Sequence, residues 1–308
     1  MKRLDADVVH AAYDGAIPPR LMVSSGDSVV VRTLDARRGA FSEIEPGTSF
    51  ELPPPSAGSS NPLTGPIAVA GARGGDALAV DVLAIEPLGP AWVGAHAHVN
   101  PLEPGRVDRS FGRIASVADG DVLYSDGVAF PARPMVGCLG TAPDEPVGAG
   151  GAGPNGGNLD HTIVRPGARV LLPVSIDDAR LFVGDVHAAQ GDGELSGVAL
   201  ETAADVTLRL SVVPDLALSW PWVETRARIA VLTCAWDFAD ARRHAVSAAM
   251  ALLEARLAMT AGDALAFISA AGDLRIGQAY GGAEMTLRLE LPRCPGLELT
   301  DLPTFQES

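Results

Sequence analysis

Two side chains that can do chemistry, Asp185 and His187, stand two positions apart in the middle of the chain. They follow an apolar run at 181–183, and strand side chains alternate between two faces, so we expect both on one face. A Gly-Asp-Gly turn at 191–193 and a second apolar run at 195–200 predict a β-hairpin here. A carboxylate and an imidazole on one strand face can hold a metal ion or transfer protons. An ordinary polar hairpin tip is the alternative, because Gly and Asp are common in turns, but the density of polar groups favours a site.

The pairing of the two hairpin strands decides which further side chain joins this face. If the bend centres on Asp192, His187 lies opposite Gly197. Glu201 is then a diagonal neighbour of Asp185, roughly 7–8 Å away, and points into the same cavity. A slip of one residue would send Glu201 to the far side of the sheet.

A second group of candidates follows the glycine-rich stretch at 148–157. Such a stretch can be a flexible linker, or a loop whose backbone comes close to a ligand. It runs directly into Asn158, Asp160 and His161, and this favours the loop beside a ligand.

The remaining histidine and cysteine patterns are weaker. His96 and His98 form an H-x-H pair that would put both rings on one side of a strand, but no carboxylate is close in sequence and loop histidines are often only solvated. Cys138 lies in a run of apolar and small residues, where cysteine is usually inert packing and only rarely a nucleophile. With Cys234 and Cys294 it makes an odd, widely spaced set that resembles neither a disulfide framework nor a metal knuckle.

Composition bounds the class of protein. The chain has 308 residues, 47 % of them hydrophobic, and its 34 Gly and 24 Pro are typical of many turns between short strands. Its net charge of −15 opposes binding to nucleic acid or to an anionic membrane. We find no apolar run of signal-peptide length at the start and none near the ~20 residues of a spanning helix, so we expect a cytoplasmic protein.

The patterning predicts roughly a dozen short strands and two late helices. Asp237 is a plausible N-cap for a helix through about Leu257, and a capping box at Thr260–Asp263 opens a second helix through Ala270. The first helix should bury one stripe, formed by Val246, Met250, Leu253 and Leu257.

These elements predict a mainly β fold, a jelly-roll-like β-sandwich with a smaller α+β subdomain that contains the two helices. We expect an N-terminal β region at 1–145, a central β region with the hairpin at 146–235, and the α+β subdomain at 236–308, packed as one compact unit. The sequence contains no phosphate-binding P-loop, dinucleotide fingerprint, HExxH or GxSxG motif.

Several separated blocks resemble the acetamidase/formamidase family, and they occur in the family's order along most of the chain. The blocks are Asn61–Pro66, Gly137–Pro143, Gly156–Asp160, Gly184–Glu194, Glu201, Asp205–Arg209 and Ala264–Gln278. The resemblance implies hydrolysis of a small amide such as formamide or acetamide, a divalent metal at the site, a β-sandwich with a small α+β subdomain, and homo-oligomers. Asn155 departs from the histidine of many relatives, and 92–111 matches no block.

From these residues and this resemblance we expect a metal-assisted amidase. Asp160, Asp185 and His187 would be the metal ligands, for zinc in preference to calcium. Such a cation polarises a carbonyl and lowers the pKa of bound water from ~15.7 towards ~7.

The catalytic proton transfer would fall to Glu201, or to Glu194 if Glu201 points away. Asn158 would hold the amide oxygen, and Gly157 and Gln190 would also contact the substrate. The partners expected are a small amide and other copies of the chain, as a homodimer or a higher homo-oligomer. The alternatives are a hydrolase of larger or cyclic amides on the same frame, a non-catalytic small-molecule-binding protein, and a cysteine hydrolase.

Overall fold

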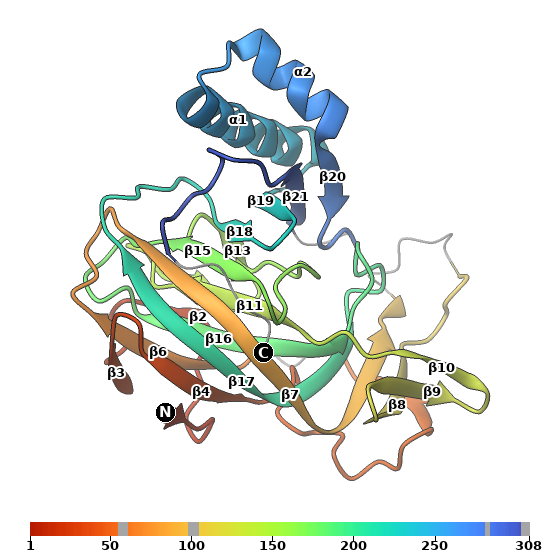
Figure 1. Cartoon of the computed structure of the whole chain (residues 1–308). Coiled ribbons are helices and arrows are strands. Elements are labelled where there is room, and N and C mark those ends of the chain that lie inside the picture. The colour runs from red at the N-terminus through yellow and green to blue at the C-terminus, as the bar shows by residue number, and fades with distance from the viewer. Residues whose placement is uncertain (55–60, 98–104, 281–283, 303–308) are drawn as a thin grey trace.

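The computed structural model describes residues 1–54, 61–97, 105–280 and 284–302, and the fold is mainly β with two adjacent helices near the C-terminus (Figure 1). The strands are β1 Lys2–Leu4, β2 Ala12–Tyr13, β3 Leu21–Ser24, β4 Ser28–Thr33, β5 Ser49–Glu51, β6 Leu63–Ala70, β7 Ala77–Ala95, β8 Phe111–Ala118, β9 Asp121–Ser125, β10 Val128–Pro131, β11 Met135–Thr141, β12 Val147–Gly148, β13 Ala152–Gly153, β14 Gly156–Asn158, β15 Arg169–Pro173, β16 Leu181–Ala189, β17 Leu200–Val213, β18 Trp222–Glu224, β19 Arg228–Ala235, β20 Asp273–Ile276 and β21 Met285–Pro292. The helices are α1 Phe238–Leu257 and α2 Ala261–Ala271.

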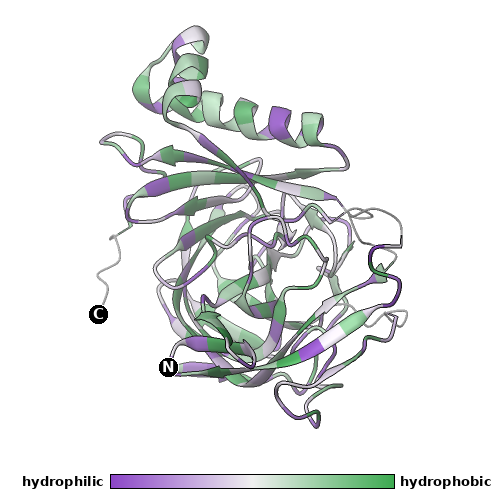
Figure 2. Ribbon diagram, turned by 90° about the vertical axis from the view of Figure 1, so that its right-hand side faces the viewer, coloured by the Kyte–Doolittle hydropathy of each residue, from purple (hydrophilic) through white to green (hydrophobic). Residues whose placement is uncertain are grey.

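A long, curled and largely antiparallel sheet forms the body of the molecule. β16 pairs with β11, β6 and β17, and β17 continues the ladder to β4 and β7. β1 on β4 and β3 on β6 are parallel pairs. In Figure 2 these strands curve around one another below the helices. The predicted mainly β class, with its smaller helical part, is confirmed.

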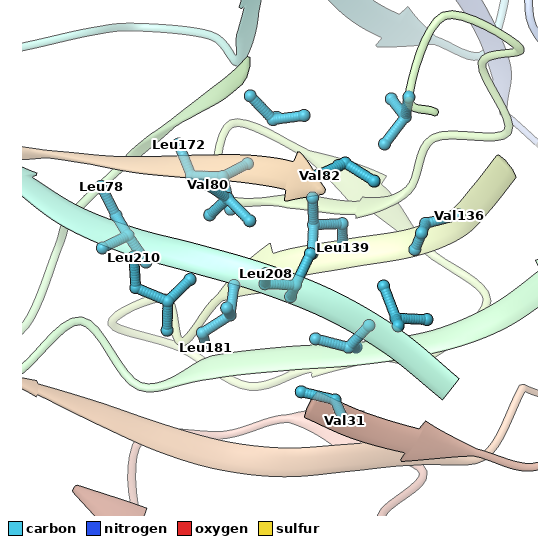
Figure 3. Close-up of a cluster of buried hydrophobic side chains, with 14 of the residues drawn as sticks. Val31, Leu78, Val80, Val82, Val136, Leu139, Leu172, Leu181, Leu208 and Leu210 are labelled. Atoms are coloured by element: carbon cyan, nitrogen blue, oxygen red, sulfur yellow. The ribbon is translucent and has the colours of Figure 1, made fainter. Parts of the chain in front are cut away.

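The core lies inside this curl, because the strands place apolar side chains there at every second position. On β17, Val206, Leu208 and Leu210 are fully buried, whereas the alternating Thr207 and Arg209 are half-buried. Figure 3 shows Leu208 and Leu210 among aliphatic side chains from β4, β7, β11, β15 and β16. Every residue of β16 is buried, so this strand is covered on both faces.

The helix boundaries agree with the predicted caps. The Asp237 side chain accepts the Asp240 backbone N–H at the start of α1, and the Thr260 side chain accepts the Asp263 N–H at the start of α2. The two helices pack over β19 and β21 at one end of the molecule (Figure 1). No helix among the described residues is long and apolar enough to cross a bilayer.

The predicted apolar stripe of α1 packs against the core, but only Leu253 of its four residues is fully buried. The helix buries Ala241, Ala245, Ala249 and Leu253. Three alanines at i, i+4 spacing let the helix approach the sheet closely, and the larger Val246, Met250 and Leu257 lie only half-buried at the edge of that contact.

The strand count was also too low. The sequence of 87–121 shows little periodicity, but β7 continues to Ala95 and pairs with β8. Proline and glycine residues within this part of β7 hid the strand from a pattern analysis. The division into regions at 145 and 235 stays a prediction.

Candidate functional site

The predicted hairpin is formed by β16 and β17, but its register was wrong. His187 pairs with Glu201 and not with Gly197. A bulge lies between His187 and Ala189, and the chain makes a broad turn before β17 begins at Leu200. A register derived from the sequence pattern assumes a bend that is tight and symmetric, and this turn is neither tight nor symmetric.

The corrected register places three side chains in one buried cluster. The Nε2 atom of His187 lies 3.5 Å from Oδ1 of Asp185 and 3.3 Å from Oε1 of Glu201. All three side chains are buried. The expectation that Glu201 points to the same side of the sheet as Asp185 and His187 therefore holds: Glu201 lies directly opposite His187 and is a diagonal neighbour of Asp185.

Asp160 joins this cluster from the chain segment after β14. One ligand atom each from Asp160, Asp185 and His187 lies within 4.8 Å of the others. Both aspartates adopt the left-handed backbone region, with φ of 49° at Asp160 and 55° at Asp185. A Cβ at Gly137 would lie 2.5 Å from Asp160 Oδ1 and 3.0 Å from Asp185 Oδ2, so only glycine leaves room for both carboxylates.

Glu194 completes a second, overlapping group from the broad turn. Its carboxylate, His187 and Glu201 each supply one ligand atom within 4.8 Å of the other two. Only 9 % of Glu194 is exposed. The structure thus brings together all five predicted ligand and proton-transfer residues.

Burial and mutual repulsion dominate the electrostatics. Burial, with the charge of Asp185, raises the pKa of Asp160 to about 8. Burial likewise raises the pKa of Glu201 to about 7, against the opposing effect of His187, and it raises the pKa of Glu194 well above its usual range. Burial alone would lower the pKa of His187, but the charges of Glu201 and Asp185 outweigh it and raise that pKa well above its usual value. The cluster holds four carboxyl groups against one imidazole, and a bound cation would stabilise the ionised form of those carboxyl groups.

Gln190 fixes the imidazole. Its Nε2 donates to the backbone oxygen of Asp160 at 2.6 Å, so its Oε1 is the atom that accepts from His187 Nδ1 at 2.8 Å. Nδ1 therefore carries a hydrogen. The raised pKa of His187 keeps a second hydrogen on Nε2, which faces Asp185 and Glu201, and a cation bound there would replace that proton and take the Nε2 lone pair. Gln190 therefore positions a site residue, and its predicted contact with substrate stays a prediction.

Asn158 is oriented by a residue that the sequence analysis had not assigned to the site. Asn61 Nδ2 donates to Asn158 Oδ1 and to Asp185 Oδ2, both at 2.9 Å. Only an NH₂ group can donate to both oxygens, so the network fixes the orientation of both amides. Gln278 Nε2 adds a hydrogen bond of 3.1 Å to the Asn158 backbone oxygen. Both residues lie in blocks that had suggested the family, but nothing local marked them as site residues.

Gly157 belongs to the tightly packed sheet beneath Asn158. It pairs with Leu139 and Ala152, and a Cβ there would lie 2.3 Å from the Gly151 oxygen. The glycine-rich stretch thus lets two backbones approach each other. Asn155 donates from Nδ2 to the Thr141 oxygen at 3.0 Å. A role for Gly157 in binding substrate stays a prediction.

The other histidine candidates do not join the cluster. His161 is fully buried, and burial lowers its pKa to about 3, so its ring is neutral. Neither His161 nor His96 belongs to a potential metal-binding group within the described ranges. His98 lies outside the described residues.

Cys138 forms part of the wall of the site. Its Sγ lies 3.0 Å from Asn158 Oδ1 and 3.8 Å from Asp185 Oδ2. The side chain is fully buried, and burial with the nearby acids raises the thiol pKa well above its usual value. The thiol is therefore protonated near neutral pH, which opposes a nucleophilic role.

We expect Cys138→Ser to keep most of the turnover, because a hydroxyl can also donate to Asn158 Oδ1. The measurement is ammonia release with acetamide, beside Cys234→Ser as a control for a second buried cysteine. A complete loss confined to Cys138→Ser, with folding unchanged by circular dichroism, would indicate covalent catalysis instead.

Known proteins resemble this chain in both sequence and fold. A family model described as "Acetamidase/Formamidase family" matches residues 2–150 and 150–225. A putative formamidase of Schizosaccharomyces pombe is 24 % identical over 276 residues, which cover 69 % of this chain and 67 % of that protein. A recombinant predicted acetamidase/formamidase from Thermoanaerobacter tengcongensis superposes with a TM-score of 0.88 at 30 % identity, over 94 % of this chain and 95 % of the other. An acetamidase from Bacillus halodurans gives 0.87 at 32 % identity, over 94 % and 97 %.

Proposed function

The chain belongs to the acetamidase/formamidase family and is an amidase that acts on linear amides, and from this premise we propose that it cleaves small carboxamides with the help of a divalent cation. The products are a carboxylate and ammonia, and formamide and acetamide are the model substrates. The observation that supports this proposal most directly is the buried cluster in which Asp160 and Asp185 form one group with His187, and Glu201 contacts the same ring.

The donor set fits a cation. Among the described residues, Asp160 Oδ1, His187 Nε2 and Glu201 Oε2 are buried without a hydrogen-bond partner. Orphaned buried polar atoms are costly unless something satisfies them. Carboxylate oxygens with an imidazole nitrogen suit zinc, whereas calcium prefers six or more oxygens. Held by Asp160, Asp185 and His187, the ion would polarise the amide carbonyl and make water a stronger acid.

The protein's own groups have the remaining tasks. Glu201 takes a proton from water as the water oxygen bonds to the carbonyl carbon, and returns a proton to nitrogen as the C–N bond breaks and ammonia leaves. Its pKa, raised by burial, suits a group that both accepts and donates protons near neutral pH. Glu194 is the second candidate for this role. Asn158, with Oδ1 held by Asn61, has its Nδ2 hydrogens to donate to the amide oxygen.

The proposal is tested by ammonia release across a panel from formamide to aryl and cyclic amides, with and without a chelator. Release that the chelator stops and added zinc restores supports it. Purified protein without stoichiometric metal, and without turnover of any amide after addition of divalent ions, would instead favour a non-catalytic small-molecule-binding protein. We also propose a homodimer or higher homo-oligomer, which analytical ultracentrifugation would test.

The cation-free protein is expected to lose stability as pH rises. The folded-state pKa values of Asp160 and Glu201, about 8 and about 7, exceed the unfolded values of roughly 4. The folded state therefore binds more protons than the unfolded state, and stability falls as pH rises through that window. The raised pKa of His187 acts in the same direction.

Urea unfolding in a chelator should accordingly give a lower midpoint at pH 8 than at pH 5.5, and zinc should reduce the difference. Equal urea midpoints at pH 5.5 and pH 8 in the chelator would contradict the raised pKa values of these buried carboxyl groups.

A further inference from the structure

A pocket of about 440 Å³ lies beside the buried cluster, between the broad turn after β16 and the β9–β10 hairpin. Gln190 and Glu194 line it, and both belong to the site: Gln190 fixes the His187 ring, and Glu194 lies within reach of His187 and Glu201. A molecule that contacts Glu194 from the pocket therefore also lies next to the proposed catalytic groups.

The walls of this pocket are mostly apolar. They include Val93, Tyr124, Phe130, Leu195, Val198 and Leu200. The rings of Tyr124 and Phe130 lie 6.5 Å apart, tilted by 41°, and form an aromatic part of this wall. Leu195 is 62 % exposed although it lines the pocket, so apolar surface remains there for a ligand to cover. In Figure 1, β9 and β10 lie together on the side of the molecule away from the helices.

The pocket is much larger than the model substrates. At about 30 Å³ for each water-sized group, formamide fills roughly 90 Å³, whereas pockets that bind larger organic ligands usually span about 300–1,000 Å³. Formamide has no carbon substituent and acetamide has only a methyl group. Neither can contact apolar walls that are contributed by β7, β9, β10 and β17 and by the broad turn.

We propose that this pocket holds the apolar substituent of the substrate, so that the preferred substrates are primary carboxamides with an aryl or branched alkyl group. The inference rests on the proposed amidase function and names its substrate class. The charged groups of the pocket, Arg133, Asp192 and Glu194, are of mixed sign and favour no ionic substituent. An uncharged substituent would cover the apolar walls while the amide end lies at Glu194.

Substrate preference is the first test. We would measure kcat/KM for acetamide, isovaleramide, benzamide and phenylacetamide with the zinc-loaded protein. We expect the best of the three larger amides to exceed acetamide by at least about tenfold, since even one methylene in an apolar pocket is worth that much. Acetamide hydrolysis that equals or exceeds all three would overturn this inference and leave the amidase function standing. No ammonia from any amide would overturn both.

A wall variant is the second test. Phe130→Ala should lower kcat/KM for the best larger amide about tenfold or more and leave acetamide within about twofold. Val128→Ala is the matched control, because Val128 is an exposed apolar residue of the same strand outside the pocket lining. Phe130 is itself 38 % exposed, so its truncation should not prevent folding.

A second copy of the chain is the competing occupant of these walls. If Phe130→Ala lowers kcat/KM equally for acetamide and for the larger amide, and also changes the sedimentation coefficient, the pocket is a subunit contact and the inference falls. The inference is also overturned if Phe130→Ala leaves the ratio of kcat/KM for the larger amide to kcat/KM for acetamide unchanged and does not change the assembly.

Discussion

Replacing His187 with alanine is expected to lower ammonia release by about 10³-fold or more, and the protein should still fold. The imidazole is the one nitrogen donor among the described residues of the cluster, and it lies between Asp185 and Glu201. Without it the proposed cation loses a ligand, and the carboxylates lose the positive charge that opposes their repulsion. The loss should appear mainly in kcat, because the ring would hold the cation that polarises the reacting carbonyl.

Folding and specificity both need controls in this experiment. Removing the ring leaves Gln190 Oε1 without its partner, which costs about 1–3 kcal/mol, so thermal unfolding must accompany the activity assay. His244→Ala is the matched control, because that ring is half-buried and stacks on Trp220 away from the cluster. Near-normal turnover by folded His187→Ala would remove His187 from the site.

Replacing Glu201 with glutamine is expected to lower kcat/KM by about 10²–10⁴-fold, the usual contribution of a general base. The amide keeps the size of the side chain but cannot take a proton from water. The base must be deprotonated to act, so wild-type kcat/KM should rise with pH through its pKa. That pKa is about 7 without a cation, and a bound cation would lower it, so the acid limb belongs at or below about pH 7. The variant should lack this limb.

Two further variants distinguish the roles of the glutamate side chains. Glu86→Gln changes an exposed glutamate of β7 and should leave turnover unchanged. Glu194→Gln tests the second candidate base. If Glu201→Gln stays active and Glu194→Gln does not, proton transfer belongs to Glu194.

Local features of the fold were predictable because their causes are local. Asp237 and Thr260 satisfy the first backbone N–H groups of their helices, and such caps can be read from neighbouring residues. The alternation of β17 likewise follows from which side chains avoid water. For the same reason, the proximity of Asp185 and His187 could be expected from their spacing alone.

Features that depend on distant parts of the chain could not be predicted. Asn61 reaches Asn158 across 97 positions and Asp185 across 124, and no local pattern announces such contacts. The requirement for glycine at Gly137 exists only because two carboxylates meet above it. The register of the hairpin failed for a related reason: a bulge follows His187, and the broad turn is bonded to a distant segment, with the Gly193 N–H donating to the Ile276 and Gly277 oxygens.

The hydrogen bonds that close the site from the C-terminal side have a consequence for how the chain is made. Gln278 donates to the Asn158 oxygen 120 positions earlier, and the Thr286 hydroxyl donates to the Leu159 oxygen 127 positions earlier. Chains are made from the N-terminus, and contacts between distant positions form slowly. The site is therefore a late product of synthesis. Until β21 is made and docks, the nascent chain can keep its acids in water, and the repulsion between them arises only when the fold closes.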